Sequence, residues 1–498
     1  MSEYVGIDLG TTFSAIAKLD EVGRPVVIRN RDGSNLTPSA VCEDDGTIIV
    51  GEVARRVASI GPNQAATRFK RDMGTEKTFR VKGHEFTPTE LSVFVLKRII
   101  QNVDEPLGDI GEVVVTIPAN FSNEAREATL AAAHAAGLNV RYIINEPTAA
   151  ALYYAFKASE SLDGVHAVYD LGGGTFDVSV IRVVGQEVHV IASNGVARLG
   201  GDDFDEALRV LVAKKYRALT GQDLDPEEFT RFDAEAPKVE LSQRDKTLIR
   251  VGRNGIEVTR REFEESISTW ITQAEMLCEA TLEEAAVDVS DVRSVLLAGG
   301  STRIPLVRTS IQRVFGKEPT STANVDEVVA LGAALYAAYR GNKSTMTTGQ
   351  ASAVERLNVT ETSTKYFGTL SFNRDNVRGV PRRENAVLIH KGTKLPCSVT
   401  ESFYTVYDGQ TGVDCTLTEA SAPETDPRFV KIVWEGKLEL PAGRPSNQEI
   451  QVTFAYDDNQ LMHCTFTDVA SGKRKEVDVS PADYDALESA TVDQFLVE

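Results

Sequence analysis

The stretch VYDLGGGTFDVSVI, residues 168–181, contains the clearest structural signal in the sequence. An apolar run that contains Asp170 ends at Leu171, three glycines follow, and a second apolar run begins at Phe176. A phosphate loop of the Walker or Rossmann kind would lead from its glycines into a helix. Here Phe176, Val178 and Val180 recur with a period of two, which favours a returning strand. The stretch therefore predicts a β-hairpin with a glycine turn.

The glycine turn suggests phosphate chemistry. Three glycines remove every Cβ atom, so backbone N–H groups can approach phosphate oxygens. Asp170 and Asp177 flank the turn and suit a hydrated divalent cation that bridges phosphates. An isolated GGG segment is more often a tight hairpin without a ligand. However, GIDLGTTFSAIA, residues 6–17, repeats the arrangement around Asp8. Two such hairpins, one in each half of a duplicated domain, could hold a nucleotide's phosphates from opposite sides.

The pattern of the sequence changes near residue 342. Before it, β-rich runs such as EVVVTIPA (112–119) alternate with Ala-rich helical runs such as ATLAAAHAAG (128–137), which is typical of α/β domains. After a polar stretch of linker composition (341–352), short runs with a period of two predict a β-sandwich.

Composition excludes several classes of protein. The chain has 498 residues, 42% of them hydrophobic, which is enough for at least two domains. Its net charge of -20 would repel a phosphate backbone, so we expect no nucleic-acid partner. The five cysteines are scattered without a CxxC pair, and no run approaches the roughly 18 apolar residues of a membrane span. We therefore expect a soluble protein of the reducing cytoplasm with no membrane partner.

Five segments together resemble the nucleotide-binding domain of the 70-kDa heat-shock (DnaK-type) chaperones. They are GIDLGTTFS, VVVTIPANF, INEPTAAAL, YDLGGGTFDVS and LAGGSTRIP. The resemblance implies an α/β, actin-like (ribonuclease H-like, duplicated) two-lobed ATPase domain. Later segments, including VLIHKGTKLP and EIQVTFAYDDNQLMHCTFTD, resemble the family's peptide-binding β-sandwich. The expected organisation is 1–342 for the nucleotide-binding domain, 343–360 for the interdomain linker, 361–480 for the sandwich and 481–498 for a short tail. That tail starts like a helix, with Ser480 as its cap.

The resemblance implies ATP or ADP as the nucleotide, with Mg²⁺ and, as a further candidate ion, K⁺. It assigns the Mg²⁺ water shell to Asp8, Asp170 and Asp177. The implied phosphate contacts are Gly10, Thr11, Thr12, Gly172, Gly173 and Gly174. The implied adenosine contacts are Glu235, Lys238 and Ser242, spaced for one helical face, and Gly299, Gly300, Ser301 and Arg303.

Four residues are implied to serve catalysis. Lys70 matches the family lysine that stabilises charge on the transferred phosphate, although the sequence alone would make it a solvated surface lysine. Glu146 stands at an expected helix start, with Asn145 available as the cap, and would help to orient the attacking water. Thr175 would lie beside the γ-phosphate, and Asp177 would act through the metal shell.

The resemblance also implies sites outside the cleft. Val413 matches the central peptide-pocket position, with Phe403 and Phe367 as walls, and ordinary core positions are an equal alternative for all three. Pro118 and Arg126 match positions that relay the nucleotide state between domains. The implied partners are unfolded or extended polypeptides and a J-domain co-chaperone, and we expect a monomer.

Several features depart from the family pattern. The segment VERLNV carries Glu355, Arg356 and Asn358 in place of an apolar linker that ends in aspartate, and Tyr142 replaces the family arginine before INEP. Both changes predict weaker linker docking. The upper parts of both lobes are shorter, which argues against dependence on an exchange factor. A helical lid after the sandwich is not evident, so peptide release should be fast.

We therefore expect an atypical chaperone ATPase whose hydrolysis alters its affinity for peptides. One alternative is a nucleotide-switched module for a single dedicated partner, which the altered linker favours. Another is a metabolite kinase, because actin-like domains also transfer phosphate to small hydroxyl compounds; the resemblance through residue 480 argues against it. Broad binding on a peptide array separates the first hypothesis from the second.

Overall fold

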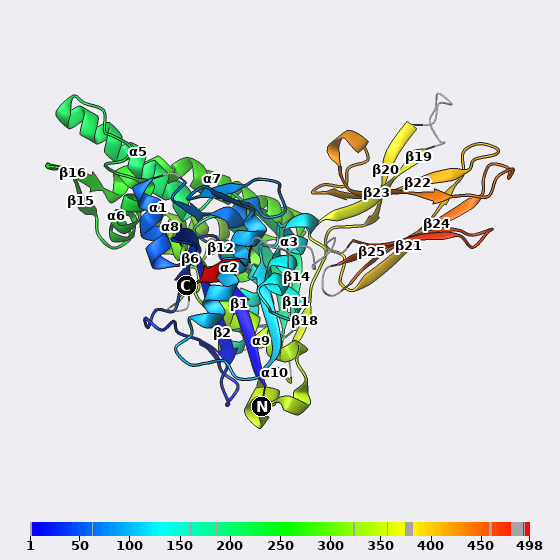
Figure 1. The fold of residues 1–498 in the computed structure, drawn as a ribbon, viewed down its shortest axis with the longest axis horizontal. Helices are drawn as coiled ribbons and strands as arrows, with labels where there is room; N and C mark the ends of the chain where they lie inside the picture. Colours follow the sequence, from blue (N-terminus) through cyan, green and yellow to red (C-terminus); the bar gives the residue numbers. More distant parts are fainter. Residues whose placement is uncertain are drawn as a thin grey trace. The chain divides into compact units, whose positions relative to one another are not determined.

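The computed structural model divides into two compact units along the chain. The first comprises Met1–Asn358 and Ala482–Glu498, and the second comprises Val359–Pro481. Figure 1 shows the elements of both units. The structure describes residues 2–61, 63–158, 162–185, 187–321, 324–355, 357–373, 382–457, 461–479, 492 and 494–498.

The first unit begins with the predicted hairpin of β1 (Glu3–Asp8) and β2 (Phe13–Leu19). The two strands are antiparallel, with Asp8 opposite Ala15. They belong to a sheet with the order β11-β10-β1-β2-β3, in which β10 runs parallel to both β1 and β11. Its other strands are β3 (Pro25–Val27), β4 (Thr37–Pro38), which pairs with β2, β10 (Ile110–Ile117) and β11 (Val140–Asn145).

The second sheet repeats this plan, which confirms the internal duplication. The glycine-rich stretch forms the antiparallel hairpin of β12 (Gly164–Leu171) and β13 (Phe176–Val184), with Asp170 opposite Asp177. The strand order is β17-β12-β13-β14-β18, and β12 and β17 run parallel. The remaining strands are β14 (Glu187–Val196), β17 (Val292–Ala298) and β18 (Asn358–Thr360). Each glycine hairpin therefore starts the sheet of one lobe.

Two Ala-rich helices connect the lobes. Helix α4 (Glu146–Lys157) packs on the second sheet, α9 (Val328–Arg340) packs on the first, and the two helices pack against each other. Small residues allow this close approach: a Cβ atom on Gly332 of α9 would lie 1.7 Å from the carbonyl oxygen of Ala149. The hinge region between the lobes is thus tightly packed backbone.

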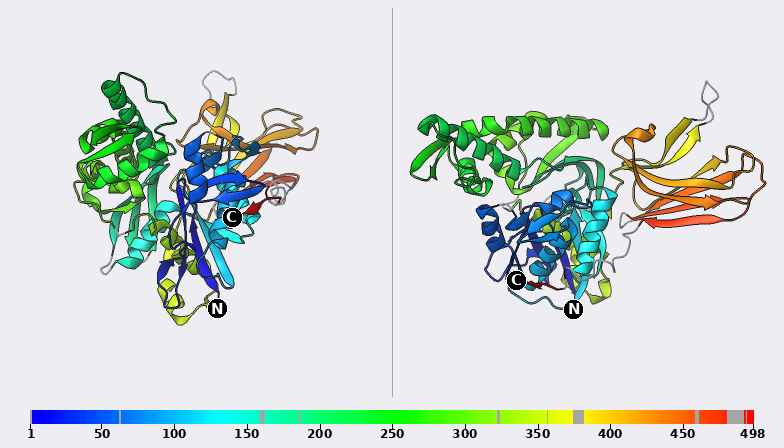
Figure 2. Two further views of the ribbon diagram at one scale, coloured as in Figure 1. Left: turned by 60° about the vertical axis from the view of Figure 1, so that its left-hand side comes forward. Right: turned by 45° about the horizontal axis from the view of Figure 1, so that its top comes forward.

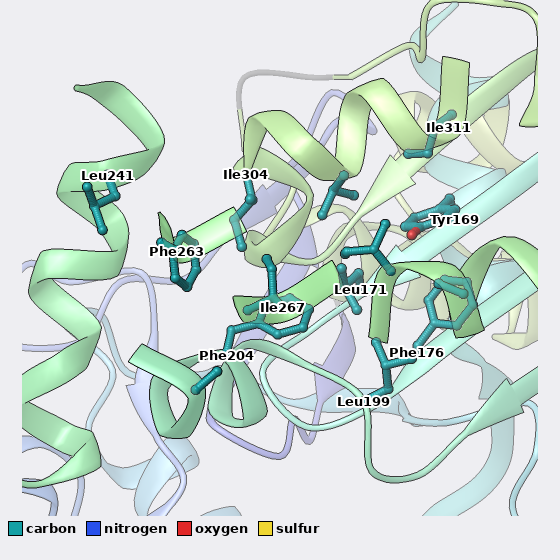
Figure 3. Packing of buried hydrophobic residues seen from close by; sticks show 14 of the residues in the cluster. Tyr169, Leu171, Phe176, Leu199, Phe204, Leu241, Phe263, Ile267, Ile304 and Ile311 are labelled. Atoms are coloured by element: carbon teal, nitrogen blue, oxygen red, sulfur yellow. The ribbon is translucent and has the colours of Figure 1, made fainter. Parts of the chain in front are cut away.

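A large apolar core holds the glycine hairpin of the second lobe. Figure 3 shows Leu171 and Phe176, which flank the turn, among Phe204, Ile267 and Ile311 from the surrounding helices. Each fully buried Leu or Phe stabilises the fold by about 1.5–3 kcal/mol. The helices around this core are α5 (Gly201–Thr220), α6 (Arg231–Gln243), α7 (Arg260–Glu284) and α8 (Pro305–Phe315). The residues on both sides of the turn are therefore anchored in a tightly packed core.

A smaller subdomain extends the first lobe. Its helices are α1 (Glu52–Ile60) and α2 (Pro88–Gln101), whereas α3 (Asn123–Ala135) packs on α2 and on β10 and β11 of the first sheet. Its sheet has the order β27-β6-β5-β7, formed by β5 (Ala40–Asp44), β6 (Thr47–Val50), β7 (Ala65–Thr67) and β27 (Leu496–Val497). The helix expected from Ser480 falls on residues outside the described ones. The last described residues instead form β27, which lies beside the first-lobe strands in Figures 1 and 2.

The short upper segments of both lobes are hairpins. They are β8 (Phe79–Val81) with β9 (His84–Phe86), and β15 (Lys246–Val251) with β16 (Asn254–Thr259).

Residues expected to act as a linker are folded onto the first unit. Helix α10 (Thr348–Val354) begins with a capping box at Thr347, whose hydroxyl also donates to the Glu21 carbonyl at 2.6 Å. The buried Gln350 amide donates to the Leu19 carbonyl at 3.3 Å. Leu357 is buried as well. The polar composition of this stretch therefore reflects capping and side-chain hydrogen bonds.

The second unit contains two four-stranded antiparallel sheets, as the period-two runs predict. One has the order β20-β19-β22-β23, from β19 (Tyr366–Asn373), β20 (Arg382–Ile389), β22 (Gly412–Ala420) and β23 (Lys431–Glu439). The other has the order β21-β24-β25-β26, from β21 (Cys397–Tyr404), β24 (Glu449–Tyr456), β25 (Met462–Asp468) and β26 (Arg474–Val479). Burial alternates along β24 and β25, and the inward side chains form one core.

Among the described residues, no helix follows β26, and none is long and apolar enough to cross a membrane. All five cysteines are unpaired, and four of them are buried.

The contact between α4 and α9 generates a stability prediction. Gly332→Ala should lower the free energy of unfolding by about 2–3 kcal/mol, because the new methyl group would overlap the α4 backbone. Gly61→Ala is the matched control, since its added Cβ meets no atom within 4 Å. Urea denaturation of both variants measures the difference, and equal stability would contradict the tight packing.

Candidate functional site

The two glycine hairpins meet at a cavity of about 570 Å³ in the first unit. The predicted residues that line it are Asp8, Gly10, Thr11, Thr12, Lys70, Glu146, Asp170, Gly172, Gly173, Gly174, Thr175, Glu235, Lys238, Ser242, Gly299, Gly300, Ser301 and Arg303. The cavity thus brings together residues from both halves of the unit. Asp177 lies one strand away, buried opposite Asp170.

The hairpin tips lie directly against each other. A Cβ atom on Gly173 would sit 2.0 Å from the Thr12 hydroxyl oxygen, and one on Gly174 would sit 2.3 Å from the Thr11 methyl group. Only glycine fits at these two positions of the second hairpin. Because glycine has no side chain, the backbones of the two turns can approach each other closely, as the repeated sequence pattern predicts.

The orientation of the second turn is fixed by its carbonyl groups. The backbone N–H groups of Gly201 and Asp202, at the start of α5, donate to the carbonyls of Gly172 (3.0 Å) and Gly173 (2.8 Å). The Ser301 hydroxyl also donates to the Gly172 carbonyl at 2.8 Å. In a trans peptide the N–H points away from the carbonyl. The amides of Gly173 and Gly174 therefore face away from α5, in the arrangement that anion-binding turns use.

Acidic side chains are concentrated beneath the turns. Burial, together with the nearby Glu146, raises the pKa of Asp8 to about 7, and burial followed by repulsion from Glu146 and Asp177 raises the pKa of Asp170. The Thr116 hydroxyl donates to Asp8 at 3.0 Å. Full ionisation of these carboxyl groups is therefore unfavourable unless a cation compensates their charge.

The carboxylate oxygens suit a hard divalent cation such as Mg²⁺. Among the described residues, no group of three or more His, Cys, Asp or Glu side chains has the geometry to ligate a metal ion directly. Asp8 and Asp170 fit a cation that keeps most of its own water molecules, which is usual for Mg²⁺.

Lys70 is not a surface lysine. Its ammonium lies 2.5 Å from the Glu146 carboxylate, and the two side chains are only 5% and 9% exposed. Arg68, with a left-handed φ of 63°, turns the chain from β7 into the 3₁₀ helix Phe69–Asp72 that carries Lys70. Glu146 starts α4 and Asn145 occupies the N-cap position, both as predicted, although the Asn145 side chain makes no capping hydrogen bond.

The predicted adenosine residues form a second wall. Lys238 lies 2.8 Å from Asp205 and donates to the Gly201 carbonyl at 3.0 Å. Arg303 pairs with Asp326 at 2.7 Å. Asp205 and Asp326 also line the cavity, and the sequence reading did not identify either of them.

The sequence also did not predict three ion pairs between the two lobes. Arg55 of α1 pairs with Glu235 of α6. Arg68 lies 2.6 Å from Asp202. Close by, Arg71 lies 2.8 Å from Asp203. The segment RFKRD faces GGDD here, and only this charge complementarity could have predicted the pairs of Arg68 and Arg71. They hold the smaller subdomain of the first lobe over the cavity.

The predicted relay positions lie next to the cleft. Pro118 is buried at the end of β10, and its carbonyl accepts from the Phe121 amide at 3.2 Å. Arg126 is also buried and donates to the carbonyls of Phe121 and Ala119, each at 3.4 Å. Phe121 in turn faces Lys70, with the ammonium 5.8 Å from the ring centroid. A packed connection through Phe121 therefore joins Arg126 to Lys70.

Tyr142, which replaces the family arginine, has a partner of its own. The Arg340 guanidinium lies 3.9 Å from its ring centroid, in a cation–π arrangement. The segment VERLNV, which was expected to dock weakly, overlaps the start of β18. This strand is the neighbour of β14 in the second sheet.

The predicted peptide residues occupy different environments in the sandwich. Phe367 is 2% exposed and packs edge-to-face on Tyr456, so it belongs to the core. Phe403 on β21 and Val413 on β22 are half-buried against that core.

The fold and the site define a two-lobed nucleotide-binding protein whose cleft is built from two glycine hairpins, with a β-sandwich as a separate unit. A family model described as "Hsp70 protein" matches residues 4–81 and 77–498. The chain belongs to the Hsp70 family. Membership implies ATP binding and an ATP-dependent, chaperone-like activity, and proteins of this family are generally ATPases.

The raised pKa of Asp8 gives a prediction of pH dependence. Because the folded-state pKa is about 7 and the ordinary value is 3.8, this group favours folding most below about pH 4, and the contribution is lost as the pH rises through 7. Asp8→Asn should therefore raise the melting temperature of the nucleotide-free first unit by about 2–4 °C at pH 8.

The difference should shrink at pH 5 and vanish only below about pH 4, where Asp8 is protonated in both the folded and the unfolded chain. Calorimetric melting curves at both pH values test this, with the exposed Asp223→Asn as a control that should change neither. An equal difference in melting temperature at both pH values would show that burial does not disfavour the ionised form of Asp8.

Proposed function

We propose that this protein is an Hsp70-type chaperone that hydrolyses Mg²⁺-ATP in the cleft and uses the cycle to control peptide binding by the β-sandwich. One observation carries the proposal: the two glycine turns touch at their tips above buried carboxylates, with Lys70 and Glu146 beside them. A metabolite kinase is not supported, because the Hsp70 match extends through the sandwich.

The turns would bind the phosphates mainly through backbone N–H groups. The amides of Gly173 and Gly174, with the hydroxyl groups of Thr11 and Thr12, offer hydrogen-bond donors on two sides. Asp8 and Asp170 would hold the water shell of Mg²⁺, which when bound neutralises charge on the phosphates. Thr175 follows the second turn and lines the cavity, and it is the proposed contact of the terminal phosphate.

Lys70 and Glu146 have complementary roles in the proposed hydrolysis. The Lys70 ammonium is preorganised in a buried position, where it can stabilise negative charge that develops on the transferred phosphate. Glu146 holds the lysine in place and accepts a hydrogen bond from it. Its carboxylate is also the group available to orient an attacking water molecule.

The β-sandwich would bind extended polypeptide segments by backbone hydrogen bonds and a pocket for an apolar side chain. Phe403 and Val413 are the proposed contacts, because both are apolar and only half-buried. Phe367 would support the pocket from inside the core. Arg126, Phe121 and Lys70 form the proposed start of the path by which the nucleotide state reaches the sandwich.

ATP turnover with and without an extended apolar peptide tests this function. The peptide should stimulate wild-type turnover, because the two units belong to one coupled cycle. Lys70→Ala should lower turnover by about 10²–10³-fold while nucleotide binding persists, since the lysine acts mainly on transition-state charge.

Lys246→Ala is the matched control, because Lys246 is exposed on a surface hairpin and should be dispensable. Full activity of Lys70→Ala would remove the catalytic assignment. Turnover that ignores every peptide, with binding of a single sequence on an array, would favour the dedicated-partner module instead.

A further inference from the structure

The second unit of the chain is inserted between two segments of the first. The chain leaves the first unit at Asn358 and returns to it from Ala482 onward. Its last described residues then form a strand on the smaller subdomain of the first lobe. Neither the nucleotide site nor the proposed peptide site explains this return.

The docking is specific in its backbone pairing. Leu496 and Val497 pair in parallel with Thr47 and Ile48 of β6. The Glu498 amide donates to the Ile48 carbonyl at 2.8 Å, and the Val50 amide donates to the Glu498 carbonyl at 2.8 Å. The segment therefore completes the edge of a sheet that would otherwise expose unpaired backbone groups.

An aromatic pocket anchors the same segment. The Phe495 ring makes edge-to-face contacts with His84, Phe86 and Phe94, at centroid distances of 5.3, 5.7 and 6.2 Å. Such aromatic pairs are worth more than their buried area alone. Val497 is buried, whereas Leu496 is 64% exposed. Alternate residues thus face the pocket and the solvent, as in a bound β-strand.

The sheet that receives the strand leads directly to the nucleotide site. Its far strand, β7, continues through Arg68 into the 3₁₀ helix that holds Lys70. Its near strand, β6, ends at Val50, and α1 follows with Arg55, the partner of Glu235 across the cleft. The aromatic contacts continue in the same direction, because β9 pairs with β8, whose Phe79 packs on Phe69 at 6.4 Å.

We propose that Gln494–Glu498 is a docking strand that braces the subdomain carrying Lys70 and Arg55, and that its release speeds the loss of bound nucleotide. The acceptor site is the β6 edge together with His84, Phe86 and Phe94, and its occupant is the chain's own segment.

The test uses the full chain with Phe495→Ala and, as a matched control, Leu496→Ala. Hydrogen exchange of residues 47–50 reports docking without reference to ATPase or chaperone activity. Phe495→Ala should raise exchange at the Val50 amide about tenfold or more, because its acceptor carbonyl on Glu498 is lost. Leu496→Ala should leave this exchange unchanged.

Release of a fluorescent ADP analogue provides the functional readout. It should be several-fold faster in Phe495→Ala than in the control, and a synthetic QFLVE peptide added in excess should restore slow release. Val497→Ala, a smaller truncation at the buried position, should give an intermediate rate. Unchanged protection at Val50, or equal release from Phe495→Ala and Leu496→Ala, would overturn the proposal.

Discussion

The structure of the first unit depends on the contact between two backbone turns. Gly173 and Gly174 can approach Thr11 and Thr12 only because they lack side chains. The carbonyls of the second turn are tied to the start of α5, which directs its amides the other way. This contact places donors for phosphate on both sides of one cavity, and it leaves buried carboxylates below whose charge needs a cation. A nucleotide carried with a divalent ion satisfies both requirements.

The surroundings preserve this arrangement at two levels. The interlocked helices α4 and α9 fix the lobes at their base, where the packing has no room for an added methyl group. At the open side, Arg55, Arg68 and Arg71 pair with acidic residues of the other lobe. These outer pairs are more exposed than the packed helices at the base. The docking strand supports the subdomain that carries them.

Local patterns in the sequence were enough to predict the core of this fold. The period-two runs beside the glycines predicted both hairpins, and the repeat predicted the two similar lobes. The cavity residues followed from the resemblance, and all but Asp177 line it. What the sequence did not reveal depends on residues far apart in the chain. Arg55 and Glu235 are paired by tertiary packing alone, and the two-residue strand β27 is too short to show a periodic pattern. Residues 348–354 resembled a linker because their polar side chains serve caps and hydrogen bonds.

Calorimetric titration of the full chain with ATP tests the central claim most directly, with Mg²⁺ present and then with Mg²⁺ removed by a chelator. If the facing turns hold phosphates above a cation site, ATP binds at one saturable site and the affinity falls sharply without the metal ion. A chain that releases no heat with ATP, or that binds it equally well without Mg²⁺, would contradict this account of the cleft.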